Sequence, residues 1–288
     1  MNVPQFFPQG DQRNDALKHG AEFLAMLEDL IQALDQVAIA EGDSWLYHGH
    51  TISKKFFFHV HAAYALLPGV TIPGVGLDVL PFGSIFAIVR AAIETFVTFG
   101  HVYGAEDPDE RYFRFLIWTA AGLNDRQSFN ATTREAQEVI AAEALEIQRL
   151  LAEIQAHPRF QGLDKEARGR ITGKRIEWRG AKSWAQLASE SGIHSGYFQQ
   201  LYGFLCSYSH ASYLAVLQIG QAPPEKEREM AVSILMALNV FMCQFAVIYA
   251  RLFPQAEKVL EPYRRTKAFN SWFRDKSFWD SWYGPEKP

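Results

Sequence analysis

The longest apolar segment of the chain, from Ala231 to Ala250, restricts its fold more than any other feature. A helix of this length is about 30 Å long, enough to cross a bilayer or to run through the middle of a helical bundle. Three polar residues, Ser233, Asn239 and Gln244, interrupt the segment, and lysine and arginine are not strongly biased to either flank. We therefore interpret it as the central helix of a bundle and expect no membrane partner, while a membrane-associated helical protein stays an alternative.

The overall composition is that of a folded domain. Hydrophobic residues make up 48% of the 288 residues and charged residues 21%, which excludes a largely disordered chain. The formal net charge of −4 excludes a uniformly basic surface, so contact with nucleic acid would need a local patch. The two cysteines, Cys206 and Cys243, lie in separate apolar runs, and no cluster of Cys and His has zinc spacing. We expect no disulfide framework, no metal and no cofactor, and the lack of a signal-peptide pattern favours a cytoplasmic location.

Hydrophobic residues recur at helical spacing along most of the chain, and no convincing strand pattern stands out. Asp107 and Pro108 suit the cap and first position of a helix, and the run from Thr132 to Glu135 is a capping box.

The segment from Pro68 to Pro81, rich in proline and glycine, is predicted to be a loop. The predicted fold class is all-α, an antiparallel multi-helix bundle. The expected helices cover about residues 14–39, 52–67, 83–103, 108 onward, 133–156, 183–192, 195–219 and 224–253.

The chain divides into three predicted parts. Residues 1–81 supply N-terminal helices and a loop, residues 82–253 form the core helical bundle, and residues 254–288 form a tail dense in aromatic residues. Aromatic-rich ends usually bury their rings, so we expect the tail to pack on the bundle or on a partner. Surplus aromatic surface also favours a homodimer.

One polar stripe lies on the helix predicted over residues 83–103. Arg90, Glu94, Thr98 and His101 fall on one face of a helix that is otherwise apolar. A buried arginine and glutamate must find partners, because an unpaired buried charge costs several kcal/mol. The order Arg–Glu at a spacing of four is the weaker one for a pair within a helix. The two groups therefore either fix the helices as a structural ion pair or line a polar pocket in the bundle core.

A second polar group lies on the helix predicted over residues 195–219. Ser207 and His210 share one helix face, next to a face that carries Tyr202. Serine is a mediocre helix former, so a helix interior this rich in hydroxyl groups is unusual. The simplest interpretation of His210 is a core histidine, but a position facing Arg90 and Glu94 would suit acid–base chemistry near neutral pH.

Together these motifs resemble an uncharacterised, mostly bacterial family of all-helical domains. The resemblance rests on an R-x-x-x-E helix at Arg90 and Glu94 and on a Y-x(4)-S-x-x-H helix at Tyr202, Ser207 and His210. It covers about residues 82–217, and further residues between the two helices contribute to it: Arg111, Tyr112, Arg114, Trp178 and Tyr197. That family in turn looks distantly like the HEPN helical bundles, some of which are ribonucleases of phage defence and toxin–antitoxin systems. The resemblance implies a fold more than an activity.

The HEPN ribonuclease motif itself is absent. It consists of an arginine, four to six intervening residues and a histidine on one helix, and the matching positions before His210 hold Gly203, Phe204 and Leu205. A ribonuclease of this type would need Arg90 to supply the cation from a different helix. On that hypothesis the candidate catalytic residues are His210 as acid or base, Arg90 for phosphate charge, and Glu94 to orient one of them.

Three functions stay open. The first is a binding or assembly module without catalysis, the second a HEPN-like ribonuclease or other hydrolase in stress or phage defence, and the third a membrane-associated protein. A site open to solvent that contains Arg90, Glu94 and His210 would favour catalysis. Burial of the three side chains against one another would favour a structural role. A basic stretch from Arg159 to Lys182 is a candidate contact for RNA. The candidate binding residues are Tyr202, Ser207, His101, Arg111 and Arg114.

Overall fold

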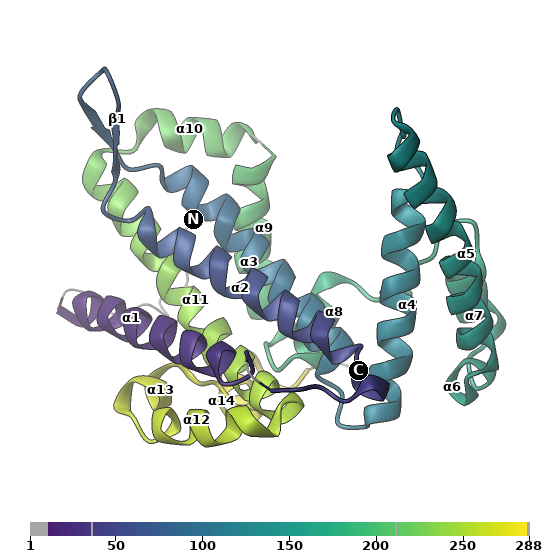
Figure 1. Cartoon of the computed structure of the whole chain (residues 1–288). Coiled ribbons are helices and arrows are strands. Elements are labelled where there is room, and N and C mark those ends of the chain that lie inside the picture. The colour runs from purple at the N-terminus through teal and green to yellow at the C-terminus, as the bar shows by residue number, and fades with distance from the viewer. Residues whose placement is uncertain (1–10, 36, 211, 287–288) are drawn as a thin grey trace.

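The computed structural model describes residues 11–35, 37–210 and 212–286. In this part of the chain the fold is all-α, an antiparallel helical bundle, as the sequence predicts (Figure 1). The bundle helices are α1 (Asp11–Gln32), α2 (Leu46–Ala65), α3 (Phe82–Tyr103), α8 (Trp184–Glu190), α9 (Ser195–Ser209), α10 (Tyr213–Gln221) and α11 (Pro224–Leu252). A short 3₁₀ helix, η1 (Glu41–Asp43), precedes α2.

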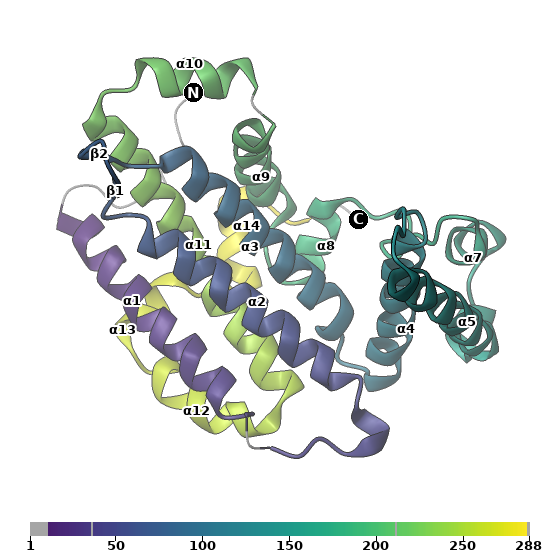
Figure 2. The same cartoon turned by 45° about the horizontal axis from the view of Figure 1, so that its top comes forward.

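Helices α3 and α11 form the centre of the bundle, with α2 against α3 and α1 against α11 (Figure 2). Phenylalanines join the two central helices, because the ring of Phe96 lies 5.3 Å from that of Phe241, and the ring of Phe99 lies 4.7 Å from that of Phe245. Both helices are long and apolar enough to cross a membrane, but 56% of the most apolar window of α3 and 83% of that of α11 lie buried inside the bundle. The segment Ala231–Ala250 is thus the central part of α11.

Four helices stand at one side of the bundle as an arm (Figure 1). They are α4 (Pro108–Arg126), α5 (Arg134–Ala156), α6 (Pro158–Gln161) and α7 (Lys165–Thr172). Helix α4 joins the arm to α3, and α5 packs along α4. The predicted start of α4 is confirmed, since the Asp107 carboxylate accepts a hydrogen bond from the backbone N–H of Asp109 and Pro108 is the first helical residue. Helix α5 is capped by Thr133, one residue after the predicted Thr132.

The segment from Pro68 to Pro81 is not a plain loop, and this prediction is wrong. It forms a β-hairpin in which β1 (Val70–Ile72) pairs antiparallel with β2 (Leu77–Val79). Gly74 and Gly76 take positive φ angles of 82° and 65°, which glycine adopts without strain and which let so short a segment reverse direction. The first two helices also differ from prediction, since Asn14 lies within α1 and does not cap it, α1 ends at Gln32 and not near Ile39, and α2 begins at Leu46 and not at Ile52.

The aromatic C-terminal segment forms three short helices, α12 (Pro254–Arg264), α13 (Lys267–Trp272) and α14 (Lys276–Tyr283), packed on the bundle. Trp272 and Trp279 are both 6% exposed. Each indole also finds a hydrogen-bond acceptor, because Trp272 donates to His19 Nδ1 over 3.0 Å and Trp279 donates to the carbonyl of Gly192 over 3.0 Å. Trp272 therefore anchors this segment on α1, and Trp279 anchors it beside the N-terminus of α9.

Candidate functional site

Two residues of α3, one from the middle of α9 and the C-cap residue of α9 form a polar quartet: Arg90, Glu94, Tyr202 and His210. Arg90 Nε donates to Glu94 Oε1 over 3.0 Å, so the pair within the helix forms despite its weaker order. The Tyr202 hydroxyl donates to the same Glu94 oxygen over 2.6 Å. Arg90 Nη1 lies 3.2 Å from His210 Nε2, and the guanidinium carbon lies 5.4 Å from the centre of the Tyr202 ring. Residues 120 positions apart in the sequence thus meet in one site.

The place of His210 depends on a helix break that the sequence analysis missed. The predicted helix over residues 195–219 is two helices, because α9 ends at Ser209 and α10 begins at Tyr213. Ser212 caps α10, since its hydroxyl accepts a hydrogen bond from the backbone N–H of Ala215. His210 is therefore the residue that ends α9, with its side chain exposed, and not a core histidine.

The hydrogen bonds of the quartet define the protonation of its members. A guanidinium can only donate, so Nε2 of His210 is the acceptor and its ring carries a proton on Nδ1 in this arrangement. Burial raises the pKa of the Tyr202 phenol, and its hydrogen bond to Glu94 raises this pKa further. Tyr202 therefore stays a neutral hydroxyl donor at physiological pH.

The quartet is paired internally, yet solvent reaches it. The side chains of Arg90 and Glu94 are 20% and 31% exposed, and His210 is exposed. The site is therefore not a sealed ion pair in the bundle core. A ligand arriving from solvent can contact His210 and the outer edge of Arg90 without unfolding any element.

His101 lies on the same face of α3 as Arg90 but belongs to a second cluster. Its Nδ1 lies 3.1 Å from Glu190 Oε2, and Lys182 forms an ion pair with the same carboxylate. Arg114 Nη1 donates to the backbone carbonyl of His101 over 2.8 Å. Burial opposes ionisation of Glu190, but hydrogen bonds from His101 and Lys182 lower the pKa of its carboxyl to about 2.

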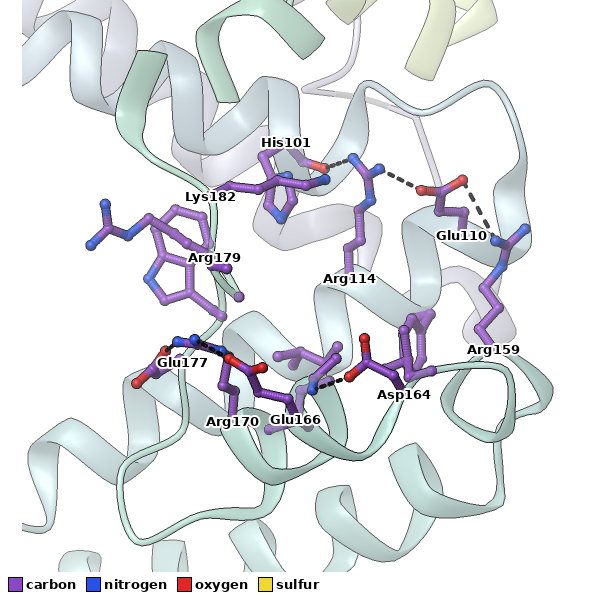
Figure 3. A pocket seen from close by; sticks show the side chains of 18 of the residues that line it. His101, Glu110, Arg114, Arg159, Asp164, Glu166, Arg170, Glu177, Arg179 and Lys182 are labelled. Carbon is purple, nitrogen blue, oxygen red and sulfur yellow. Dashed lines mark hydrogen bonds and ion pairs between the residues drawn. The ribbon is translucent and has the colours of Figure 1, made fainter. Parts of the chain in front are cut away.

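This second cluster borders a pocket of about 690 Å³ between the bundle and the arm (Figure 3). Five Lys and Arg side chains line the pocket: Arg114, Arg159, Arg170, Arg179 and Lys182. Carboxylates neutralise four of them, since Glu110 and Glu190 bind Arg114, Glu166 and Glu177 bind Arg170, Glu190 binds Lys182, and Asp107 and Asp109 bind Arg159. Arg179 alone among the five has no carboxylate partner in the described part of the chain.

Two of the candidate binding residues lie outside both clusters. The side chain of Arg111 has a buried Nε without a hydrogen-bond partner among the described residues, and burial lowers its pKa together with the nearby charge of Arg251. Ser207 is held within α9, where its hydroxyl donates to the carbonyl of Phe204 over 2.6 Å. The five candidate binding residues therefore do not form a single site.

A family model describing a family of unknown function, DUF5677, matches residues 82–226. The chain belongs to DUF5677. The predicted membership of an uncharacterised helical family is thereby confirmed. No curated protein and no solved structure shows significant similarity to the chain.

The DUF5677 region begins with α3 and ends in the first turn of α11, so it contains the quartet and the pocket. Sequence reasoning missed two of the residues that shape these sites, Glu190 and Trp184, whereas Arg179 lies in the basic stretch Arg159–Lys182 that it singled out. The helix predicted over residues 183–192 is α8, which Ser183 and Gln186 start with a capping box. In the described part of DUF5677 and its flanks, no three His, Cys, Asp or Glu side chains lie close enough to hold a metal ion.

Proposed function

We propose that this DUF5677 protein cleaves RNA at the quartet, by side-chain chemistry. The observation that supports the proposal most is the 3.2 Å distance between Arg90 Nη1 and His210 Nε2, at a position that solvent reaches. A histidine paired with a fixed cation combines the two groups that phosphodiester cleavage needs, a proton acceptor and a stabiliser of phosphate charge. In this chain the cation comes from α3 and the histidine from α9, in place of a single helix that carries both.

The proposed reaction uses the ribose 2′-oxygen as nucleophile. His210 Nε2 accepts the proton of the 2′-hydroxyl as this oxygen attacks the adjacent phosphorus. A P–O2′ bond forms and the P–O5′ bond breaks, and the 5′-oxygen takes a proton from solvent. Arg90 exchanges its contact with His210 for the charged phosphate oxygens, while Glu94, which also accepts a hydrogen bond from the Tyr202 hydroxyl, holds the guanidinium in place. The products are a 2′,3′-cyclic phosphate and a 5′-hydroxyl.

The test is cleavage of an end-labelled single-stranded RNA by the purified protein, with and without a metal chelator. We expect cyclic-phosphate ends in both conditions, and no cleavage where the 2′-hydroxyl next to the scissile phosphate is replaced by hydrogen. His210→Ala should lower the rate about a hundredfold or more, the usual loss when a general base is removed. Arg90→Lys should also lower the rate, because an ammonium cannot keep the planar contacts of the guanidinium.

The matched control is His61→Ala, which removes an exposed histidine of α2. Equal activity of His210→Ala and wild type, at equal thermal stability, overturns the proposed role of His210. Activity that the chelator abolishes overturns the proposal of chemistry without metal.

An assembly function is a second candidate, favoured by the outer face of α10. Tyr213, Val216 and Ile219 are 81%, 57% and 51% exposed, at a spacing that places them along one side of the helix. The helix Tyr213–Gln221 carries no Lys, Arg, Asp or Glu, so its exposed face suits an equally uncharged surface. A second copy of the chain offers such a surface, and a homodimer through α10 is the assembly that we propose.

A further inference from the structure

We propose that an aromatic ladder beside the quartet holds unpaired bases of single-stranded RNA. The ladder consists of Trp178 and Trp184, which take the bases, and of Tyr202, the quartet residue that joins them to the site and whose ring is stacked on Phe198 at 5.1 Å. The inference rests on the proposed function, because it assigns the path of the RNA chain on either side of the scissile phosphate. It concerns binding, so it can be tested apart from cleavage.

The three rings form a continuous series that starts at the quartet. The ring centres of Tyr202 and Trp184 are 6.2 Å apart, and those of Trp184 and Trp178 are also 6.2 Å apart. Beyond Trp178, the ring of His101 lies at 5.7 Å and leads to the pocket between bundle and arm. All three rings of the ladder are partly exposed to solvent, so they differ from the sealed phenylalanine pairs of the bundle core.

Arginines lie over two of these rings. The guanidinium of Arg90 is centred 5.4 Å from the ring of Tyr202, and that of Arg179 is centred 5.0 Å from the ring of Trp184. Arg90 is bound to Glu94, but Arg179 has no carboxylate partner in the part of the chain that the structure describes. Figure 3 shows the Arg179 side chain extending away from Arg114 and Glu110, on the far side of the pocket.

The other four cations that line the pocket are neutralised by carboxylates, so among the described residues Arg179 is the lining cation that lacks a carboxylate partner. Surplus charge and partly exposed rings therefore coincide at Arg179 and Trp184. This combination suits a single strand, because its bases can stack on aromatic rings and on guanidinium planes while its phosphates meet cations. A duplex keeps its bases stacked within the helix, so it cannot use the rings.

The experiment measures binding of a short fluorescent oligoribonucleotide in which every 2′-hydroxyl is methylated. This probe lacks the nucleophile of the proposed reaction, so cleavage cannot disturb the titration. Trp184→Leu should weaken binding about tenfold or more, the usual loss for one stacked base. Arg179→Lys keeps the positive charge but removes the planar guanidinium on which a base can stack, and it should weaken binding severalfold. A duplex of the same sequence should bind less tightly than the single strand.

The matched control is Arg134→Gln, which removes a charge from an exposed residue at the start of α5. Thermal melts identify any variant that fails to fold, and Arg179 is the safer position because its head group lies over the ring of Trp184 and has no carboxylate partner among the described residues. Wild-type affinity of both Arg179→Lys and Trp184→Leu overturns the ladder, as does equal affinity for the duplex. Ladder-dependent binding without cleavage of unmodified RNA upholds the ladder and overturns the ribonuclease. Cleavage that neither Arg179→Lys nor Trp184→Leu changes upholds the ribonuclease and overturns the ladder.

Discussion

At the scale of single residues, the quartet combines a structural role with the proposed chemical one. Glu94 accepts hydrogen bonds from Arg90 and Tyr202, so removing Arg90 leaves a partly buried carboxylate without its cation. We expect Arg90→Met to lower the free energy of unfolding by about 1–3 kcal/mol, and by less where Glu94 is already replaced by Gln. Urea unfolding of both single variants and the double variant measures this coupling. Equal losses in both backgrounds would mean that the two side chains do not stabilise each other.

The second residue prediction concerns His101, which faces Glu190, Arg114 and Lys182. Burial lowers the pKa of His101 from its ordinary value of 6.5, against the opposing hydrogen bond to Glu190. Below pH 6.5 the unfolded chain therefore binds a proton that the folded protein does not, so stability falls as the pH drops toward the lowered pKa. The slope is at most about 1.4 kcal/mol per pH unit for one group.

His101→Gln keeps a hydrogen-bond donor for Glu190 but cannot titrate. We expect its free energy of unfolding to change less with pH than that of wild type just below pH 6.5, while the two proteins run parallel above it. His50 and His59, whose pKa values burial also lowers, are present in both proteins and cancel in the comparison. Parallel curves below pH 6.5 as well would show that His101 does not titrate differently on folding.

At the scale of elements, local signals predicted where some of the helices start but not what their faces meet. Pro108 and Ser183 mark the starts of α4 and α8, and such signals depend only on neighbouring residues. Both starts could therefore be predicted from the sequence. The stripe on α3 was also visible, but Arg90 and His101 are separated by about 16 Å along the helix axis. They therefore meet different partners, and the stripe serves two clusters. Those partners come from distant parts of the chain, which helical periodicity does not encode.

The docking of α14 on the start of α9 is an element-scale feature that can be tested directly. The Glu286 carboxylate accepts hydrogen bonds from the backbone N–H and the hydroxyl of Ser195, both over 2.7 Å, and Trp279 is buried beside it. We expect Trp279→Ala to lower the free energy of unfolding by about 3–5 kcal/mol, as for other large buried rings. Trp282→Ala, on the same helix but 58% exposed, should cost less than about 1 kcal/mol. Similar losses for the two variants in urea unfolding would contradict the packing described for this segment.

At the scale of the whole molecule, the apolar centre, the polar site and the exposed face of α10 occupy different regions. The centre of the bundle, α3 and α11, is apolar and carries the fold. The quartet and the ladder lie where α3, α8 and α9 meet, while the arm adds a pocket whose charges largely cancel. Helix α10 exposes three large apolar side chains away from the interior, Tyr213, Val216 and Ile219, and it begins shortly after His210. A partner bound to α10 would therefore lie next to the end of α9, where His210, the candidate base, is located.

The oligomeric state tests this arrangement. If α10 forms a homodimer, Val216→Glu places two like charges close together across the two-fold axis, and the dimer should dissociate. We expect light scattering during size-exclusion chromatography to give the mass of a dimer for wild type and of a monomer for Val216→Glu, with little change in thermal stability of the isolated chain. Leu145→Glu on α5, also an exposed apolar position at 68%, is the matched control and should stay dimeric. A wild-type protein that is monomeric at every concentration, or a Val216→Glu variant that stays dimeric, would show that α10 is not the interface.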